Sequence, residues 1–189
     1  MSLVILGIGT ATPQQKIQQQ HAALLATNLI GNKAPAERTM QAIYRQTKIA
    51  QRSSVLLDGP HEGVVTQEFF QPATSSEDHG PTTQERMARY ATEATPLAVT
   101  AVEKALAKAD VAAAEITHLV TCSCTGFQAP GVDIALMREL GLSNATSRTH
   151  IGFMGCRARA ASAKLQALPR VKQPHARSSW RRRAAPRPR

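Results

Sequence analysis

Cysteine and aromatic residues are scarce in this chain, and both shortages narrow what it can be. Its 189 residues include only 3 Cys, and 4% of them are aromatic. Cys122, Cys124 and Cys156 are an odd number and too few for the disulfide framework of a small secreted protein. A single Cys-x-Cys pair with no second pair or histidine cluster nearby does not indicate a zinc site. We therefore expect a reduced setting, no bound metal and no tightly bound cofactor.

Long apolar runs and an export signal are also missing. The sequence has no stretch of about 18 consecutive apolar residues, so it indicates no membrane span. Residues 1–7 have no basic segment, and their apolar run is too short for a signal peptide. These absences favour a cytoplasmic protein.

Acidic residues are absent from the carboxy-terminal stretch. Residues 157–189 hold 11 of the 23 Lys and Arg but none of the 13 Asp and Glu. Their prolines and the triple arginine at 181–183 predict a disordered basic tail, because so little apolar surface cannot offset the entropy lost on ordering. A composition dominated by Arg, Ala, Pro and Ser is typical of GC-rich DNA translated out of frame, so we expect a frame change in the gene after Cys156. By charge alone, the tail would bind polyanions in a salt-dependent way.

Apolar periodicity in residues 1–156 alternates between strand and helix patterns. Apolar runs predict strands at residues 3–8, 53–57, 117–122 and 149–153. Helical spacing predicts helices at residues 17–30, 36–46, 83–108 and 132–140. Thr83 is the expected N-cap of the third helix, Pro96 is expected to kink or break it, and residues 58–83 are expected to form a long surface loop. The alternation indicates an α/β fold with a mixed sheet and helices on its faces.

Residues 148–156 have the form of a short strand that runs into a tight turn with a cysteine at its tip. Gly155 lets the backbone approach a substrate closely. Cys156 follows where a helix is expected to begin, and the positive end of a helix dipole favours the thiolate, the nucleophilic form of cysteine. The alternative is a buried structural cysteine, which is common in protein cores.

Three motifs in this order carry a resemblance to one family. They are Gly-Ile-Gly-Thr-Ala-Thr-Pro at 7–13, Val-Thr-Cys-Ser-Cys-Thr-Gly-Phe-Gln-Ala-Pro-Gly-Val-Asp at 120–133 and His-Ile-Gly-Phe-Met-Gly-Cys at 150–156. Together they resemble the type III polyketide synthases, the chalcone synthase-like enzymes. The resemblance covers residues 1–156, roughly the amino-terminal half of a usual member. It implies half of a thiolase-type fold, and a homodimer for the intact enzyme.

The resemblance also implies a reaction. Such enzymes load an acyl group from coenzyme A onto a cysteine, extend it by decarboxylative condensation with malonyl-CoA and cyclise the product. The resemblance places that cysteine at Cys156, where exchange between two thiolates forms the thioester with little thermodynamic cost. A ketoacyl-ACP synthase of the same fold is a second interpretation, disfavoured by the Cys-Thr-Gly-Phe-x-Ala-Pro-Gly loop at 124–131. A non-enzymatic basic protein that binds polyanions through its tail is a third.

The same resemblance suggests residues for the acyl pocket. Cys124 and Thr125 fall where the family lines its starter and elongation pocket, and we prefer that role to metal binding. Ala129 falls where plant members often carry a methionine, so the smaller side chain leaves room for a bulkier or longer acyl chain.

Residues for the coenzyme A phosphates are less clearly marked. The basic positions of plant members fall on Thr39, Ala42 and Gln46, none of which is basic. Arg45, Lys48 and Arg52 lie close by and are our candidates for coenzyme A binding. A solvated basic surface is the alternative for these three.

The second half of such enzymes supplies a histidine and an asparagine that stabilise the enolate, together with a phenylalanine gatekeeper. Nothing after Cys156 matches that half, and His175 lies in the basic tail. We therefore expect a truncated chain that does not catalyse condensation alone. His150 is expected to be a hydrogen-bonded histidine of the core, and Cys122 a core-packing residue.

Overall fold

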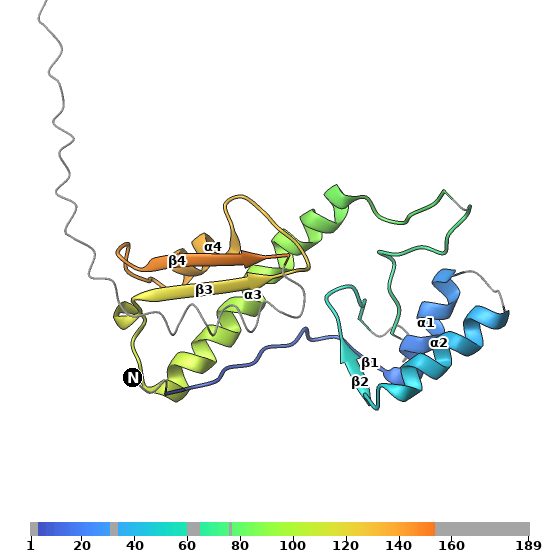
Figure 1. Cartoon of the computed structure of the whole chain (residues 1–189), viewed down its shortest axis with the longest axis horizontal. Helices are drawn as coiled ribbons and strands as arrows, with labels where there is room; N and C mark the ends of the chain where they lie inside the picture. Colours follow the sequence, from blue (N-terminus) through green and yellow to red (C-terminus); the bar gives the residue numbers. More distant parts are fainter. Residues whose placement is uncertain (1–3, 31–33, 60–64, 76, 154–189) are drawn as a thin grey trace, which may run out of the picture.

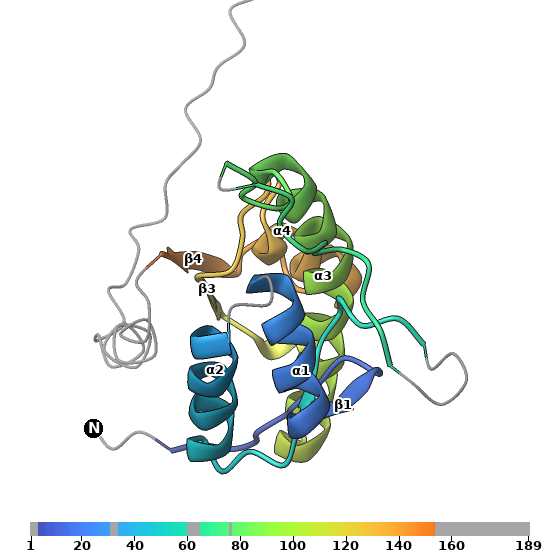
Figure 2. The same cartoon turned by 90° about the vertical axis from the view of Figure 1, so that its right-hand side faces the viewer.

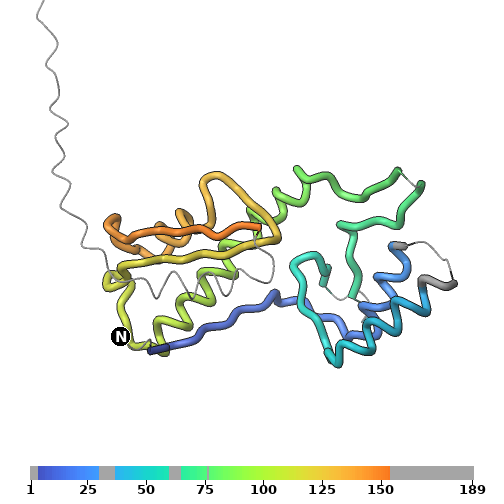
Figure 3. The backbone as a smooth tube through the Cα atoms, viewed as in Figure 1, coloured from blue at the N-terminus to red at the C-terminus, as the bar shows by residue number. Residues whose placement is uncertain are grey.

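The computed structural model of the chain describes residues 4–30, 34–59, 65–75 and 77–153, and it therefore leaves Cys156 and the basic tail outside the described residues. The elements in chain order are β1 (Lys16–Gln18), α1 (Gln19–Ile30), α2 (Ala34–Gln46), β2 (Gln51–Ser53), α3 (Thr83–Ala109), a single 3-10 turn (Ala113–Glu115), β3 (His118–Ser123), α4 (Val132–Glu139) and β4 (Ser147–Gly152). Figures 1 and 3 show two units joined by the loop that leads into α3. We call residues 16–53 the hairpin unit and residues 83–153 the parallel-strand unit.

The hairpin unit packs α1 against α2 and carries a short antiparallel strand pair. Ala22 and Ala23 are buried, and their small side chains let the two helices approach closely. β1 pairs with β2, with Ile17 opposite Arg52. The predicted helices at 17–30 and 36–46 are confirmed apart from their first residues. The predicted strand at 53–57 is wrong, because the residues that pair with β1 are Gln51–Ser53 and the chain turns after them.

Gln19 connects the parts of the hairpin unit through hydrogen bonds. Its side chain is buried, and its Nε2 donates to the carbonyl oxygen of Tyr44 at 2.9 Å and to Oγ1 of Thr47 at 2.8 Å. Arg52 Nε donates to Gln19 Oε1 at 2.8 Å, and the backbone N–H of Gln19 donates to the carbonyl of Ala50. A buried side-chain amide is stable only when its polar atoms have hydrogen-bond partners. The partners of Gln19 lie in α2 and in β2, so this one residue links α1 to both elements.

The long helix α3 begins at a capping box. Thr82 Oγ1 accepts from the backbone N–H of Glu85, and the Glu85 carboxylate accepts from the backbone N–H of Thr82 at 2.7 Å. The predicted N-cap at Thr83 is wrong by one residue, because Glu85 lies three positions after Thr82 and completes the box only there. Of the kink or break predicted at Pro96, the break is wrong, since α3 continues through it to Ala109, and the kink stays a prediction. None of the helices in the described residues is long and apolar enough to cross a membrane.

The parallel-strand unit is built on β3 and β4, which pair in parallel with Thr121 opposite His150 and Cys122 opposite Ile151. Both α3 and α4 lie on one side of this strand pair (Figures 1 and 2). The buried apolar residues of the unit are Val132, Leu136, Leu142 and Ile151. The two predicted strands and the two predicted helices of this unit are confirmed, with every end within two residues of its predicted position. The α/β class is confirmed, with antiparallel and parallel pairing divided between two separate two-stranded sheets.

Two expectations about buried positions are wrong. Cys122 is exposed rather than packed in the core. Residues 4–8 form no strand with any other described part of the chain, and the side chains of Val4, Ile5, Leu6 and Ile8 are 62–72% exposed. The segment lies instead on α3, because a Cβ at Gly7 or Gly9 would overlap the backbone of Ala105 or Ala101. Backbone contact of this kind requires glycine.

Candidate active site

The carboxyl ends of β3 and β4 lie at the same edge of their sheet, because the two strands are parallel. Ligands of open α/β sheets bind beyond that edge. The loop 124–131 leaves β3 there, and the chain leaves β4 toward Cys156. Phe153, the last described residue, donates its backbone N–H to the carbonyl of Ser123 at 3.2 Å, so the two exits are tied together.

Phe153 has a left-handed backbone, with a φ of 55°. A bulky residue rarely adopts this conformation, and such strain is concentrated at functional sites. Its ring meets the ring of Phe127 edge-on, with 5.8 Å between centroids, and both side chains are exposed. This turn, predicted as the approach to the nucleophile, is therefore held by an aromatic pair; Gly155 and Cys156 themselves are outside the described residues.

The loop after β3 rests directly on α3. Gly126 lies against the ring of Tyr90, and a Cβ at this position would overlap that ring. The next residue, Phe127, points its backbone N–H at Sδ of Met87 at 3.3 Å. Ser123 Oγ donates to the carbonyl of Gly126 at 3.3 Å within the loop. The position of Thr125 is thus set by contacts on the residues that follow it.

Thr125 lines an apolar cavity of about 400 Å³. A volume of this size falls within the range of small-ligand sites, which is roughly 300–1,000 Å³. Its walls come from the loop that precedes α3, from α3 itself and from the residues after β2. The lining residues are Ser54, Val55, Leu56, Phe69, Phe70, Arg86, Arg89, Tyr90, Glu93, Ala94, Leu97 and Thr125.

Of the three residues predicted for the acyl pocket, only Thr125 lies in this cavity. Cys124 and Ala129 are exposed and do not line it. Tyr90, Phe69 and Phe70 were not among the predicted site residues. A signal for Tyr90 was present, because Tyr90, Ala94 and Leu97 are spaced at i, i+4 and i+7 and so share one face of a helix.

The three basic residues predicted for coenzyme A do not converge on one point. Arg52 donates to Gln19, and its guanidinium lies over the Tyr44 ring, 5.0 Å from the centroid. Lys48 follows α2 in a left-handed conformation with a φ of 54°. Only Arg45 lines two adjoining pockets between α1 and α2, of about 280 and 410 Å³.

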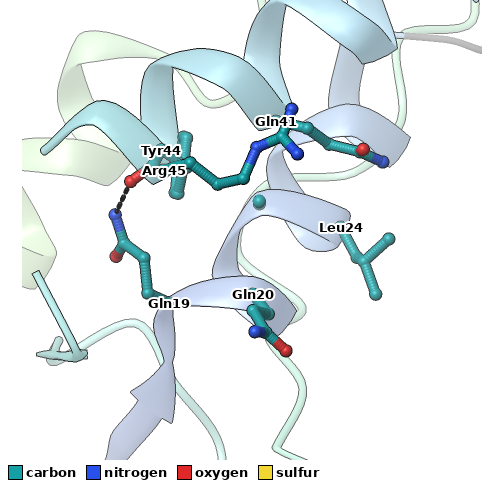
Figure 4. Close-up of a pocket in the computed structure, with 7 residues that line it drawn as sticks. Gln19, Gln20, Leu24, Gln41, Tyr44 and Arg45 are labelled. Atoms are coloured by element: carbon teal, nitrogen blue, oxygen red, sulfur yellow. Dashed lines mark hydrogen bonds between the residues drawn. The ribbon is translucent and has the colours of Figure 1, made fainter. Parts of the chain in front are cut away.

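Figure 4 shows Arg45 extending along α2 toward Gln41, with Gln20 and Leu24 on the facing helix α1. No acidic residue lines either pocket. Within the described residues the side chain of Arg45 makes no ion pair or hydrogen bond, unlike that of Arg148, which pairs with Asp133 at 2.6 Å. Of the three basic residues, Arg45 is therefore the one that lines a pocket without acids and whose side chain has no partner among the described residues.

His150 is hydrogen-bonded but not buried. Its Nδ1 lies 2.8 Å from Oγ1 of Thr121, the residue opposite it on β3. The side chain is exposed, so the expected place in the core is wrong while the expected hydrogen bond is confirmed. In the part of the chain that the structure describes, no group of three His, Cys, Asp or Glu residues could hold a metal ion.

Comparison with known proteins decides the family. The profile described as "Chalcone and stilbene synthases, N-terminal domain" matches residues 2–168. The chain belongs to the chalcone and stilbene synthase family. This confirms the predicted resemblance and disfavours a ketoacyl-ACP synthase further.

Relatives and solved structures agree with this assignment. An alpha-pyrone synthesis polyketide synthase-like protein of Mycobacterium tuberculosis is 38% identical over 155 residues, which cover 82% of this chain and 37% of that protein. Bisdemethoxycurcumin synthase of Oryza sativa subsp. japonica is 28% identical over 167 residues, covering 85% of this chain and 39% of the enzyme. The fold is similar to a fungal type III polyketide synthase, ORAS, with a TM-score of 0.68 and 30% identity over 88% of this chain and 41% of that one.

The chain thus spans well under half the length of the relatives it matches. The matched region includes Cys156 and continues to residue 168. The predicted boundary at residue 156, the disordered tail and its affinity for polyanions stay predictions, because they concern residues outside the described parts.

Proposed function

We propose that this chain carries the acyl-accepting part of a type III polyketide synthase, with Cys156 as the nucleophile. The observation that carries the proposal is the cavity of about 400 Å³ lined by Thr125, which opens beside the loop after β3. Parallel pairing puts the end of β4, four residues before Cys156, at the same edge of the sheet. Membership of the chalcone and stilbene synthase family supports the proposal independently.

The proposed step is a thioester exchange. The Cys156 thiolate attacks the carbonyl carbon of an acyl-CoA, and the bond between that carbon and the coenzyme A sulfur breaks. Coenzyme A leaves as a thiolate and takes a proton from water, while the acyl group remains on Cys156. Cys124, Thr125 and Ala129 are the proposed pocket residues, and Thr125 is the one that lines the cavity.

Coenzyme A thioesters are the proposed substrates, with an acyl-CoA as starter and malonyl-CoA as extender. Among Arg45, Lys48 and Arg52, we propose Arg45 as the phosphate contact, because it lines a pocket without acids and has no other partner among the described residues. The intact family member is proposed to act as a homodimer. Decarboxylative condensation is proposed for the intact family member.

Acyl transfer to the full 189-residue chain tests the proposal. After incubation with octanoyl-CoA, intact-mass and peptide analysis should find one octanoyl group on Cys156, with release of one coenzyme A. Cys122 and Cys124 are both exposed and serve as internal controls for unselective acylation. The Cys156→Ala variant should remain unacylated. Equal acylation of all three cysteines, or acylation of the Cys156→Ala variant, would contradict the assignment.

A further inference from the structure

The ring of Tyr90 contacts the loop after β3 and also lines the apolar cavity. On one side it carries Gly126, whose missing side chain is what allows the loop to touch the ring. On the other side it lines the cavity that also contains Thr125. The Tyr90 ring therefore lies between Gly126 and the cavity, while the neighbouring Thr125 reaches the cavity directly.

Met87 gives the loop a second point of contact on α3, through the backbone N–H of Phe127. Met87 and Tyr90 are three residues apart and share a helix face. The loop is thus supported by two side chains on the same face of α3, so removal of one ring need not release it. The space left by a smaller residue at 90 would join the cavity below Gly126 and Thr125.

The opposite wall of the cavity is aromatic and aliphatic. Phe69 and Phe70 lie edge to face with centroids 5.2 Å apart, and the guanidinium of Arg89 lies 5.7 Å above the Phe69 ring. Arg89 also pairs with Glu93 at 3.4 Å. Arg89 and Glu93 thus pair with each other, and Arg86 Nη2 donates to Oγ1 of Thr83 at 3.4 Å. Most of the remaining lining is apolar, which suits a flexible hydrocarbon chain.

We propose that Tyr90 sets the depth of this cavity and so selects the length of the saturated acyl chain that it accepts. The inference rests on the proposed function for its biological meaning, since it assigns a specificity-determining residue to the proposed acyl pocket. Ala94, one turn further along the same face of α3, is the corresponding position on the side wall. A larger residue there shortens the cavity, and a smaller residue at 90 deepens it.

Binding of free saturated carboxylates to the full-length chain tests the inference without any thioester chemistry. Isothermal titration with hexanoate to tetradecanoate should show affinity rising about fourfold per methylene until the cavity is filled, and then levelling off. Tyr90→Ala should move that limit to longer chains, whereas Tyr90→Phe, which keeps the ring, should leave it in place. Ala94→Leu should move the limit to shorter chains. Ala91→Leu, at an exposed position of the same helix, is the matched control and should change nothing.

Circular dichroism on each variant establishes that α3 remains folded. An unchanged limit in both folded Tyr90→Ala and folded Ala94→Leu would overturn the inference, and so would an equal shift in Ala91→Leu. The Cys156→Ala variant should keep the same chain-length profile. Length-selective binding without acylation of Cys156 would count against the proposed function alone, and acylation of Cys156 with no effect of residue 90 would count against this inference alone.

Discussion

The hairpin unit and the parallel-strand unit are held together by different means. In the hairpin unit, one buried glutamine donates to α2 and accepts from β2, while the apolar contacts come largely from alanines. In the parallel-strand unit, a six-residue strand ladder is covered by larger apolar side chains of α4. The first arrangement depends on polar geometry at a single residue, and the second depends on apolar volume.

The pockets of the two units also differ in the polarity of the residues that line them. The pockets of the hairpin unit contain glutamines and an unpaired arginine, which suits an anion. The cavity at the parallel-strand unit has mostly apolar walls, which suits a hydrocarbon chain. An acyl-CoA has both kinds of group, so the contrast agrees with the proposed substrate class.

Removing apolar volume from the parallel-strand unit should have the largest effect on stability. Leu136 is 3% exposed on α4, and Leu136→Ala should lower the free energy of unfolding by about 2–5 kcal/mol. Ile134 on the same helix is 38% exposed and serves as the matched control. Urea denaturation followed by circular dichroism measures both variants. A loss for Ile134→Ala as large as that for Leu136→Ala would show that volume at the core does not hold this unit.

Removing the glutamine of the hairpin unit should have an intermediate effect. Gln19→Ala leaves Arg52 Nε without its acceptor, and an unsatisfied buried polar group costs about 1–3 kcal/mol. The neighbouring Gln20 is exposed, so Gln20→Ala should stay within about ±0.5 kcal/mol.

Hydrogen exchange shows where that loss falls. Gln19→Ala should speed the exchange of amides in α1 and α2 and leave the β3–β4 ladder unchanged, because the described hydrogen bonds of Gln19 all stay within the hairpin unit. Equal acceleration of exchange in both units would mean that they unfold together, and that the different contacts within them do not give them separate stabilities.

The helices could be predicted from the sequence because their signals are local. Spacing and end residues were enough to place α1, α2, α3 and α4. The correct start of α3 could also have been predicted from local sequence, since Thr82 and Glu85 form the Thr-x-x-Glu pattern of a capping box.

Residues 4–8 could not be predicted correctly, because their contacts depend on distant residues. An apolar run indicates a buried strand only if a partner strand is available, and among the described residues none pairs with it. Gly7 and Gly9, two positions apart, were a sign of close backbone approach, but the approach is to α3 about a hundred residues later.

Site residues that lie in a sequence motif could be predicted, whereas those brought to the site only by tertiary packing could not. Thr125 came from the loop motif and lies in a cavity. Tyr90 and Phe70 reach the same cavity from segments without a motif, so only the three-dimensional arrangement brings them together. Arg45, Lys48 and Arg52 are close in sequence, yet Arg52 contacts Gln19 and Tyr44, and of the three only Arg45 lines the pockets between α1 and α2.

Acidification should have the smallest effect, and it acts on the start of α3. Hydrogen bonds from the side chain and the backbone N–H of Thr82 lower the pKa of Glu85 below its usual value. The ionised carboxylate therefore stabilises the folded state above the ordinary glutamate pKa. That contribution is lost as the pH falls through the lowered pKa, when protonation removes charge from the two hydrogen bonds.

Carboxyl titration by NMR checks this directly, and thermal unfolding at neutral and acidic pH checks its consequence. Glu85→Gln keeps an acceptor for Thr82 but cannot titrate, so this variant should lose less stability on acidification than the unmodified chain. Asp78→Asn is the control, because the pKa of Asp78 is also lowered, chiefly by the backbone N–H groups of Thr74 and Gly80 in the preceding loop. A Glu85 pKa at or above that of an unstructured glutamate would mean that the capping box does not persist in solution. The start of α3 would then fray next to Arg86 and Tyr90, and the cavity wall would lose its support from the side of the helix N-terminus.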